Sequence, residues 1–194
     1  MKARHRRRRR VAVACAVVAA GLIAGIALGL VGKVDKAIQE LTLPLRHEDI
    51  IRQQAGEKGL DPALVAAVIY SESRFRDQTS HAGARGLMQI TPATALDIAD
   101  RSEAQTFVLK DLGDPQINIS YGTYHLRDLF EQYDDNEVAA LAAYNAGSGN
   151  VDKWGGGDLE LDDIEFPETR AYVEVVLEKQ DEYRDRYSRE LGYR

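Results

Sequence analysis

The fold of this chain is decided by a strongly apolar stretch that carries a single acidic side chain near its end, DPALVAAVIYSESRF (residues 61–75). Asp61 is a good N-cap and Pro62 suits the first position of a helix, so the stretch predicts a helix over residues 62–75. The same start signal, a capping residue followed by proline, recurs at residues 91–92 and 114–115. The sequence as a whole predicts further helices at about 46–58, 92–100, 115–133, 136–146 and 168–190, with an irregular segment that contains a little β-structure at 76–90.

Glu72 is the residue of the first helix that indicates chemistry. It follows Val65, Val68 and Ile69 by seven, four and three residues, which places its carboxyl on the same helix face as these aliphatic side chains. Burial disfavours the charged form of a carboxyl and raises its pKa. A carboxylic acid that stays protonated near neutral pH can act as a general acid. The alternative is that Glu72 only marks the solvated end of the helix, where glutamate is common.

The N-terminal region predicts a membrane anchor. Residues 2–10 hold seven Lys or Arg and no acidic residue, and residues 11–32 are apolar and uncharged. About 20 apolar residues cross a bilayer, and a basic flank is expected to stay on the cytoplasmic side. We therefore expect a cytoplasmic tail (1–10), a transmembrane helix (11–32), a juxtamembrane connector (33–45) and one extracytoplasmic domain (46–194). A signal peptide cleaved near residues 25–27, which would release a secreted protein, is the alternative.

The charge and cysteine content narrow the class of partner. After Gly32 the chain has 18 Lys or Arg against 31 Asp or Glu, a net charge of about −13, which argues against a nucleic acid partner. Cys15, in the apolar stretch, is the only cysteine, so the outer domain has no disulfide. An acidic segment at 158–165 follows three glycines, and its spacing does not match an EF-hand loop. We expect a solvated loop there and no metal site.

Five short segments, taken in order, carry a family signature. They are VIYSESRF (68–75), AGARGLMQI (82–90), NISYG (118–122), ALAAYNAG (140–147) and PETRAYV (167–173). Together they resemble the catalytic domain of the soluble-lytic-transglycosylase (SLT) type, a goose-lysozyme-like family that cleaves the glycan strands of peptidoglycan. The resemblance covers residues 43 to 187. It implies a mainly α, lysozyme-like fold with a small irregular or β element, and an extracytoplasmic task in the bacterial cell envelope.

The resemblance also implies roles for individual residues. Glu72 resembles the catalytic acid and base of the family, and Ser73 the residue that follows it. Tyr144 and Asn145 resemble the pair that closes over the glutamate, with the tyrosine hydroxyl holding the carboxyl. From the sequence alone, this second pair also fits an ordinary helix end, with Gly147 as the terminating glycine.

Three more residues are assigned to substrate binding by the same resemblance. Met88 and Gln89 are expected to line the sugar groove, although a lone methionine is more often a core residue than a substrate contact. Glu168 is expected near the side of the groove that faces the stem peptide. Trp154 and most of the tyrosines are expected to pack inside the domain.

The expected chemistry needs one carboxyl and no cofactor. Most glycosidases use two carboxylates, but the only others near the motifs are Asp77, Asp97 and Asp100, and none has a clear claim to the second role. As the resemblance implies, Glu72 protonates the leaving oxygen and then takes a proton from the C6 hydroxyl of the substrate, which attacks C1 and leaves a 1,6-anhydro-muramyl end. A hydrolytic muramidase, with Asp77 or Asp97 as the second acid, is one alternative. A non-catalytic glycan-binding or scaffold module, within a wall-remodelling or secretion machinery, is the other.

Overall fold

The computed structural model describes residues 39–102 and 106–193. Its contacts divide the chain into two units, Met1–Leu43 and Pro44–Arg194. In the described end of the first unit, residues 39–42 are helical. The expected cytoplasmic tail (1–10) and transmembrane helix (11–32) lie outside the described residues. Among the helices that are described, none combines the length and the apolar character needed to span a bilayer.

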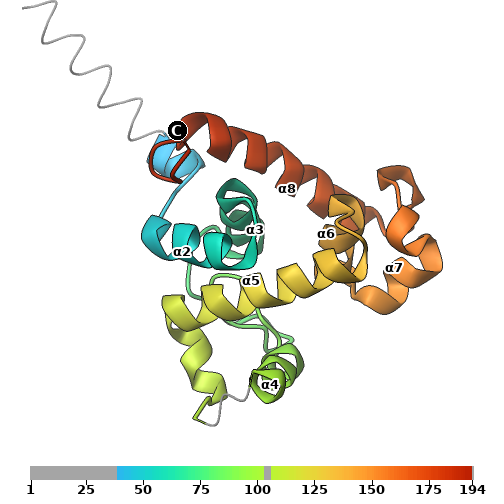
Figure 1. Ribbon diagram of the computed structural model, residues 1–194, viewed down its shortest axis with the longest axis horizontal. Coiled ribbons are helices and arrows are strands. Elements are labelled where there is room, and N and C mark those ends of the chain that lie inside the picture. Colours follow the sequence, from blue (N-terminus) through green and yellow to red (C-terminus); the bar gives the residue numbers. More distant parts are fainter. Residues whose placement is uncertain (1–38, 103–105, 194) are drawn as a thin grey trace, which may run out of the picture. The chain divides into compact units, whose positions relative to one another are not determined.

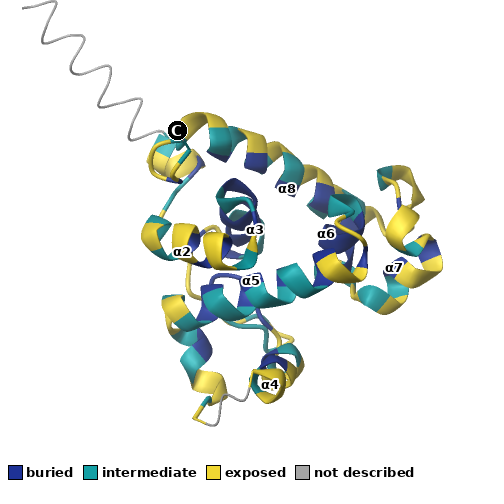
Figure 2. Ribbon diagram, in the orientation of Figure 1, coloured by how far each residue is buried: buried dark blue, intermediate teal, exposed yellow. Residues whose placement is uncertain are grey.

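The second unit is built around helix α3 (Pro62–Ser73). The helix starts where the sequence predicts, because the Asp61 carboxylate accepts the backbone N–H of Ala63 at 2.9 Å and Pro62 needs no partner for its nitrogen. Residues 63–69 are all buried, as expected for a helix that is apolar on every side. Figure 2 shows this helix in the colour of buried residues at the centre of the unit.

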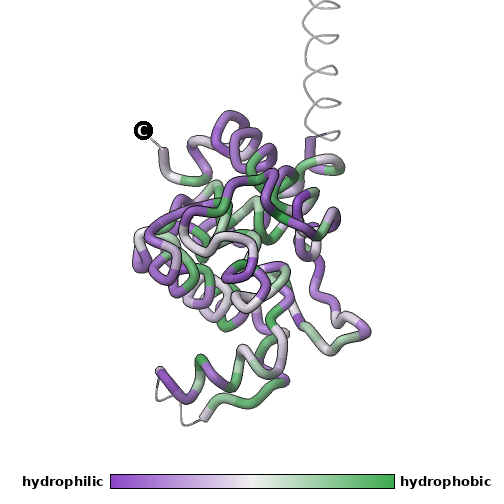
Figure 3. Tube along the Cα trace, turned by 90° about the vertical axis from the view of Figure 1, so that its right-hand side faces the viewer, coloured by the Kyte–Doolittle hydropathy of each residue, from purple (hydrophilic) through white to green (hydrophobic). Residues whose placement is uncertain are grey.

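Four helices surround α3. Helix α8 (Pro167–Arg186) packs along it most extensively, and α2 (Glu48–Lys58) packs on it as well. Helix α5 (Pro115–Gln132) lies against α2 and α6 (Glu137–Ala146), and α6 returns to α8, so that the four helices form a ring around α3 (Figure 1). In the chain trace of Figure 3, apolar and polar residues alternate along the helices.

Two smaller groups of helices extend from α5 and α6 (Figure 1). Helix α4 (Pro92–Arg101) and the 3-10 turn η1 (Leu109–Gly113) contact each other and α5. Helix α7 (Ser148–Trp154) contacts α6 and is followed by the 3-10 turns η2 (Gly156–Asp158) and η3 (Leu161–Asp163). The Trp154 ring meets the Phe166 ring edge-on at 4.8 Å, which confirms the packing role expected of this tryptophan.

The segment between α3 and α4 is irregular, as predicted. Within the described residues it forms only isolated antiparallel bridges, from Arg85 to Thr79 and to Ile90, and no strand. Gly86 is required in it for two reasons. Its φ is +80°, and a Cβ there would lie 2.1 Å from the Asn118 amide nitrogen. The absence of a side chain at Gly86 therefore lets its backbone lie close to the Asn118 side chain of α5.

All six predicted helices are present among the described residues. The mainly helical class is therefore confirmed for this part of the chain. The sequence did not predict α7 or the three 3-10 turns. The last helix was predicted to end at residue 190, whereas α8 ends at Arg186.

Candidate active site

Glu72 lies in the last turn of α3. The helix stops immediately after it because Arg74 and Phe75 both adopt left-handed backbone conformations, with φ of 51° and 60°. Such conformations cost about 1–3 kcal/mol each for residues other than glycine and tend to occur at functional sites. Phe75 is held there by burial, at 3 % exposure, and by its contact with the Tyr183 ring at 6.1 Å. The backbone turns away directly after α3, so the Glu72 side chain projects from the last turn of the helix.

The Glu72 side chain is half-buried. Burial raises its pKa from the ordinary 4.5 to about 7, and the neighbouring Tyr172 hydroxyl acts in the opposite direction as a hydrogen-bond donor. That hydroxyl is buried and has no partner within hydrogen-bond geometry among the described residues, so Glu72 is the group toward which it can donate. With a pKa of about 7, close to half of the carboxyls are protonated at neutral pH. The half-buried carboxyl and its raised pKa favour the interpretation of Glu72 as a general acid over that of a solvated helix end.

Tyr144 comes to the same place from α6. Its hydroxyl donates a hydrogen bond to the Met88 carbonyl oxygen at 2.8 Å. Burial and the nearby charge of Glu72 raise the pKa of this tyrosine well above 10, so it stays a neutral donor. The resemblance implied that this hydroxyl holds the carboxyl, whereas in the structure its proton is directed to the Met88 carbonyl.

Gln89 fixes the segment that faces the end of α3. Its own backbone is left-handed, with φ of 47°, and its side-chain amide donates to the carbonyls of Gly86 and Gln78 at 2.8 and 3.0 Å. Gln78 in turn donates to the carbonyl of Glu72 at 3.2 Å. The Gln89 side chain is therefore part of a short chain of hydrogen bonds that leads to the backbone of Glu72.

Two predicted substrate contacts are structural instead. Ser73 is 4 % exposed, and its hydroxyl donates to the carbonyls of Leu87 and Ile69 at 2.7 and 3.1 Å. Met88 is fully buried and its backbone N–H donates to the Asn118 side chain at 2.8 Å. Neither side chain can line a groove in this structure, because neither has surface to offer. Ser73 joins the segment 86–90 to α3, and Met88 joins it to α5.

Asn145 lies near the end of α6, and Glu168 lies in the first turn of α8. The Asn145 side-chain oxygen accepts a hydrogen bond from the Thr169 hydroxyl at 2.8 Å, which ties the end of α6 to the first turn of α8. Glu168, the neighbour of Thr169, is exposed. Tyr172 follows one turn later on the same helix, and sequence reasoning did not single it out. Its position in the PETRAYV segment, four residues after Glu168, was the available signal.

A second carboxyl that acts on Glu72 is not found among the described residues, because burial and Tyr172 account for the shift of its pKa. Asp77 and Asp100 are exposed. Asp97 is occupied by an ion pair with Arg101 at 2.9 Å. In the described part of the chain, no cluster of His, Cys, Asp and Glu is suited to hold a metal ion. The arrangement is that of one carboxyl able to give and take a proton.

This chain is similar in sequence to known proteins. The sequence profile of the Transglycosylase SLT domain matches residues 49–166. The soluble lytic murein transglycosylase of Escherichia coli strain K12 is 32 % identical over 157 residues, covering 76 % of this chain and 24 % of its own length. The membrane-bound lytic murein transglycosylase F of Desulfosudis oleivorans is 36 % identical over 113 residues, covering 55 % of this chain and 23 % of its own length.

A solved structure has the same fold. It is an inactive mutant of the lytic transglycosylase Slt from Pseudomonas aeruginosa, in which a glutamate is replaced by glutamine. It superposes with a TM-score of 0.72 at 31 % sequence identity and covers 77 % of this chain and 26 % of its own. The chain thus spans about a quarter of the length of the relatives that it matches.

Proposed function

This chain belongs to the Transglycosylase SLT domain family, and we propose that it cleaves the glycan strands of peptidoglycan as a lytic transglycosylase, with Glu72 as the only catalytic carboxyl. One observation carries the proposal. Glu72 is half-buried at a helix end that is closed by two left-handed residues, and burial raises its pKa to about 7. A group with that pKa serves well both as an acid and as a base at neutral pH.

The reaction uses the two forms of Glu72 in turn. The protonated carboxyl gives its proton to the glycosidic oxygen between N-acetylmuramic acid and N-acetylglucosamine as the bond from C1 to that oxygen breaks. The carboxylate then takes the proton of the C6 hydroxyl while that oxygen bonds to C1. The product ends in 1,6-anhydro-muramic acid, and Glu72 is protonated again. No water is consumed, so no second carboxylate is needed to activate one, unlike in a hydrolytic glycosidase.

Tyr172 has a role in the middle of this cycle. Its buried hydroxyl has no partner within hydrogen-bond geometry among the described residues, and as a donor near Glu72 it lowers the pKa of that carboxyl. It therefore stabilises the carboxylate that exists after the first proton transfer. Ser73 joins the segment 86–90 to the end of α3, and Tyr144 joins it to α6. Met88 joins it to α5 through Asn118, and the Gln89 side chain closes the segment on itself. Asn145, near the end of α6, and Glu168, at the start of α8, face the substrate.

The location follows from the N-terminal sequence. We propose that residues 11–32 anchor the protein in the cell membrane, with residues 1–10 in the cytoplasm, 33–45 as connector and 46–194 outside. The basic run next to the apolar stretch supports this arrangement, and relatives include a membrane-bound enzyme. Extraction of membranes with carbonate would test it, because an anchored chain stays in the pellet and a cleaved one is released.

The function is tested by digestion of purified peptidoglycan with the full chain in mild detergent. The wild-type protein is expected to release soluble fragments. Glu72→Gln is expected to release them at a rate at least about 10²-fold lower, since general acid–base catalysis raises a reaction rate on the order of 10²–10⁴-fold. Asp77→Asn is the control, because it removes the nearest exposed carboxylate in the sequence. Equal activity of the wild-type protein and Glu72→Gln would refute the assignment.

A further inference from the structure

His125 is a half-buried histidine of α5 that lies beside the candidate active site. Its ring contacts the ring of Tyr144, with 5.3 Å between the ring centres and 42° between their planes. Tyr144 donates a hydrogen bond to the Met88 carbonyl, and it is close enough to Glu72 for the charge of that carboxylate to raise its pKa. His125 is therefore only one contact away from the groups around the candidate catalytic carboxyl.

The ring contact restrains Tyr144. Two aromatic rings at such a separation and tilt attract each other beyond the gain from the surface area that they bury. The Tyr144 hydroxyl directs its proton to the Met88 carbonyl, so His125 acts on this tyrosine through ring packing. Loss of the His125 ring would leave the Tyr144 ring less restrained, and the segment 86–90 would lose part of its attachment to α6.

The position beside Tyr144 suits the neutral form of His125. Burial is the largest influence on this histidine and lowers its pKa below the ordinary 6.5. Tyr144, the titratable group that faces it from α6, has a pKa raised well above 10 and is neutral. A cation beside a tyrosine ring is attracted to the face of that ring, but the lowered pKa of His125 shows that burial outweighs this attraction. A protonated ring is therefore more stable in water or beside a carboxylate than in its place against Tyr144.

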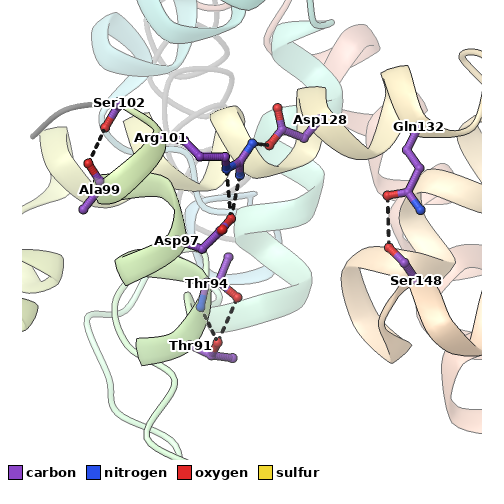
Figure 4. A network of polar contacts seen from close by, with 9 residues as sticks. All are labelled: Thr91, Thr94, Asp97, Ala99, Arg101, Ser102, Asp128, Gln132 and Ser148. Atoms are coloured by element: carbon purple, nitrogen blue, oxygen red, sulfur yellow. Dashed lines mark hydrogen bonds and ion pairs between the residues drawn. The ribbon is translucent and has the colours of Figure 1, made fainter.

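The charged groups that face His125 come from α4 and α5. Asp128 and Asp97 raise the pKa of His125, and Arg101 lowers it. Arg101 donates to both carboxylates, through Nε to Asp97 at 3.0 Å and through Nη1 to Asp128 at 2.5 Å (Figure 4). Glu131, which shares a surface cleft with His125, is itself in an ion pair at 3.0 Å. The carboxylates that could attract a protonated histidine are thus already bound, which favours the neutral ring.

We propose that His125 is a positioning residue of the candidate active site, whose neutral ring holds Tyr144 in place and whose protonation releases Tyr144 and slows cleavage at acidic pH. The inference rests on the proposed function. Glu72 cannot cause such a loss, because it begins the reaction protonated and stays protonated as the pH falls. An enzyme with this carboxyl alone would lose activity only toward high pH. A loss toward low pH therefore requires a second group.

The test is the pH profile of the initial rate of peptidoglycan cleavage by the full chain in mild detergent, between about pH 4.5 and pH 8.5. His125→Phe keeps an aromatic ring beside Tyr144 and removes the group that titrates. His125→Ala removes the ring as well. His81→Phe is the matched control, because His81 is an exposed histidine of the loop before α4. Urea unfolding at neutral pH establishes that each variant is folded.

The wild-type profile should fall on both sides. The alkaline loss should lie near the pKa of Glu72, about 7, and the acidic loss below the ordinary histidine pKa of 6.5. His125→Phe should lack the acidic loss and match the wild type at pH 7. His125→Ala should be about three- to tenfold slower at pH 7, which is the contribution of one aromatic pair. His81→Phe should match the wild type at every pH.

Three results would overturn the inference. The first is an acidic loss that persists unchanged in His125→Phe, and the second is a wild-type rate that stays constant toward low pH. The third is a folded His125→Ala protein that is as active as the wild type at pH 7. If His81→Phe removes the acidic loss as well, that loss does not belong to His125 and the inference fails.

A measurement that does not depend on activity separates this inference from the proposed function. In NMR spectra of the full chain in detergent micelles, the ring signals of Tyr144 should shift as His125 is protonated, and this shift should disappear in His125→Phe. Tyr144 signals that do not follow the titration would refute the coupling. If the wild-type chain cleaves nothing at any pH, the proposed function is wrong and the NMR titration still decides the coupling. If the chain cleaves peptidoglycan and His125→Phe keeps the acidic loss, only the role of His125 is wrong.

Discussion

Replacement of Glu72 by glutamine should stabilise the folded protein, and by an amount that depends on pH. Burial raises the pKa of Glu72 from 4.5 to about 7 in the folded state, so the folded protein binds this proton more tightly than the unfolded chain does. The stability that Glu72 contributes is fully present below pH 4.5 and is lost as the pH rises to about 7. The loss amounts to about 3 kcal/mol, at 1.36 kcal/mol for each unit of pKa.

Glutamine has nearly the same shape and no charge, so the variant avoids this loss. The difference in the free energy of unfolding, Glu72→Gln minus wild type, should be near zero at pH 4.5 and about 3 kcal/mol in favour of the variant at pH 8. Urea unfolding at a series of pH values measures it, with the fluorescence of Trp154 as the probe. This residue is the only tryptophan of the chain and is 9 % exposed.

The control for this experiment is Asp77→Asn. Asp77 is an exposed carboxyl close to Glu72 in the sequence, and surface substitutions of this kind usually stay within about 0.5 kcal/mol. A Glu72→Gln difference that stays flat between pH 5 and pH 8, or that favours the wild type at high pH, would refute the conclusion that this carboxyl is desolvated.

Two further predictions concern neighbours of Glu72. Tyr172→Phe removes the hydroxyl that lowers the pKa of Glu72. The pH profile of peptidoglycan cleavage should therefore move to higher pH by about one unit, the effect of one hydrogen bond to a charged group. An unchanged profile would mean that the hydroxyl does not act on the carboxyl. Gly86→Ala places a Cβ 2.1 Å from Asn118 at a positive φ and should cost at least about 2 kcal/mol in urea unfolding. Gly149→Ala, which meets nothing within 4 Å, should be neutral or stabilising, and equal effects of the two changes would contradict the packing described for Gly86.

Much of the helical framework could be predicted from the sequence because its start signals are local. The caps Asp61, Thr91 and Asp114 each precede a proline, and in the structure each side chain accepts a backbone N–H of the helix that follows. Helix α7 could not be predicted in this way. It has seven residues, contains Gly149 and lies between Gly147 and Gly155, so it shows no apolar period and depends on its contacts with α6.

A residue of the candidate site could be predicted from the sequence where its chemical type conflicts with the local sequence around it. Glu72 is such a residue, because a carboxyl on an apolar helix face must either be paired or have a raised pKa. Ser73 and Met88 are not, since only the packing of the segment 86–90 shows that they are anchors and not substrate contacts. Tyr172 lies 100 residues from Glu72 in the sequence, and its place beside the carboxyl follows from the packing of α8 on α3.

The most direct test of a single-carboxyl mechanism is the mass of the cleaved ends. Purified peptidoglycan is digested with the wild-type chain, and the fragments are analysed by mass spectrometry beside a Glu72→Gln digest. The mechanism predicts non-reducing muramyl ends that are lighter by one water, formed by attack of the C6 hydroxyl, and their absence with Glu72→Gln. Reducing ends that contain an added water would contradict it, because they require a second group to activate water.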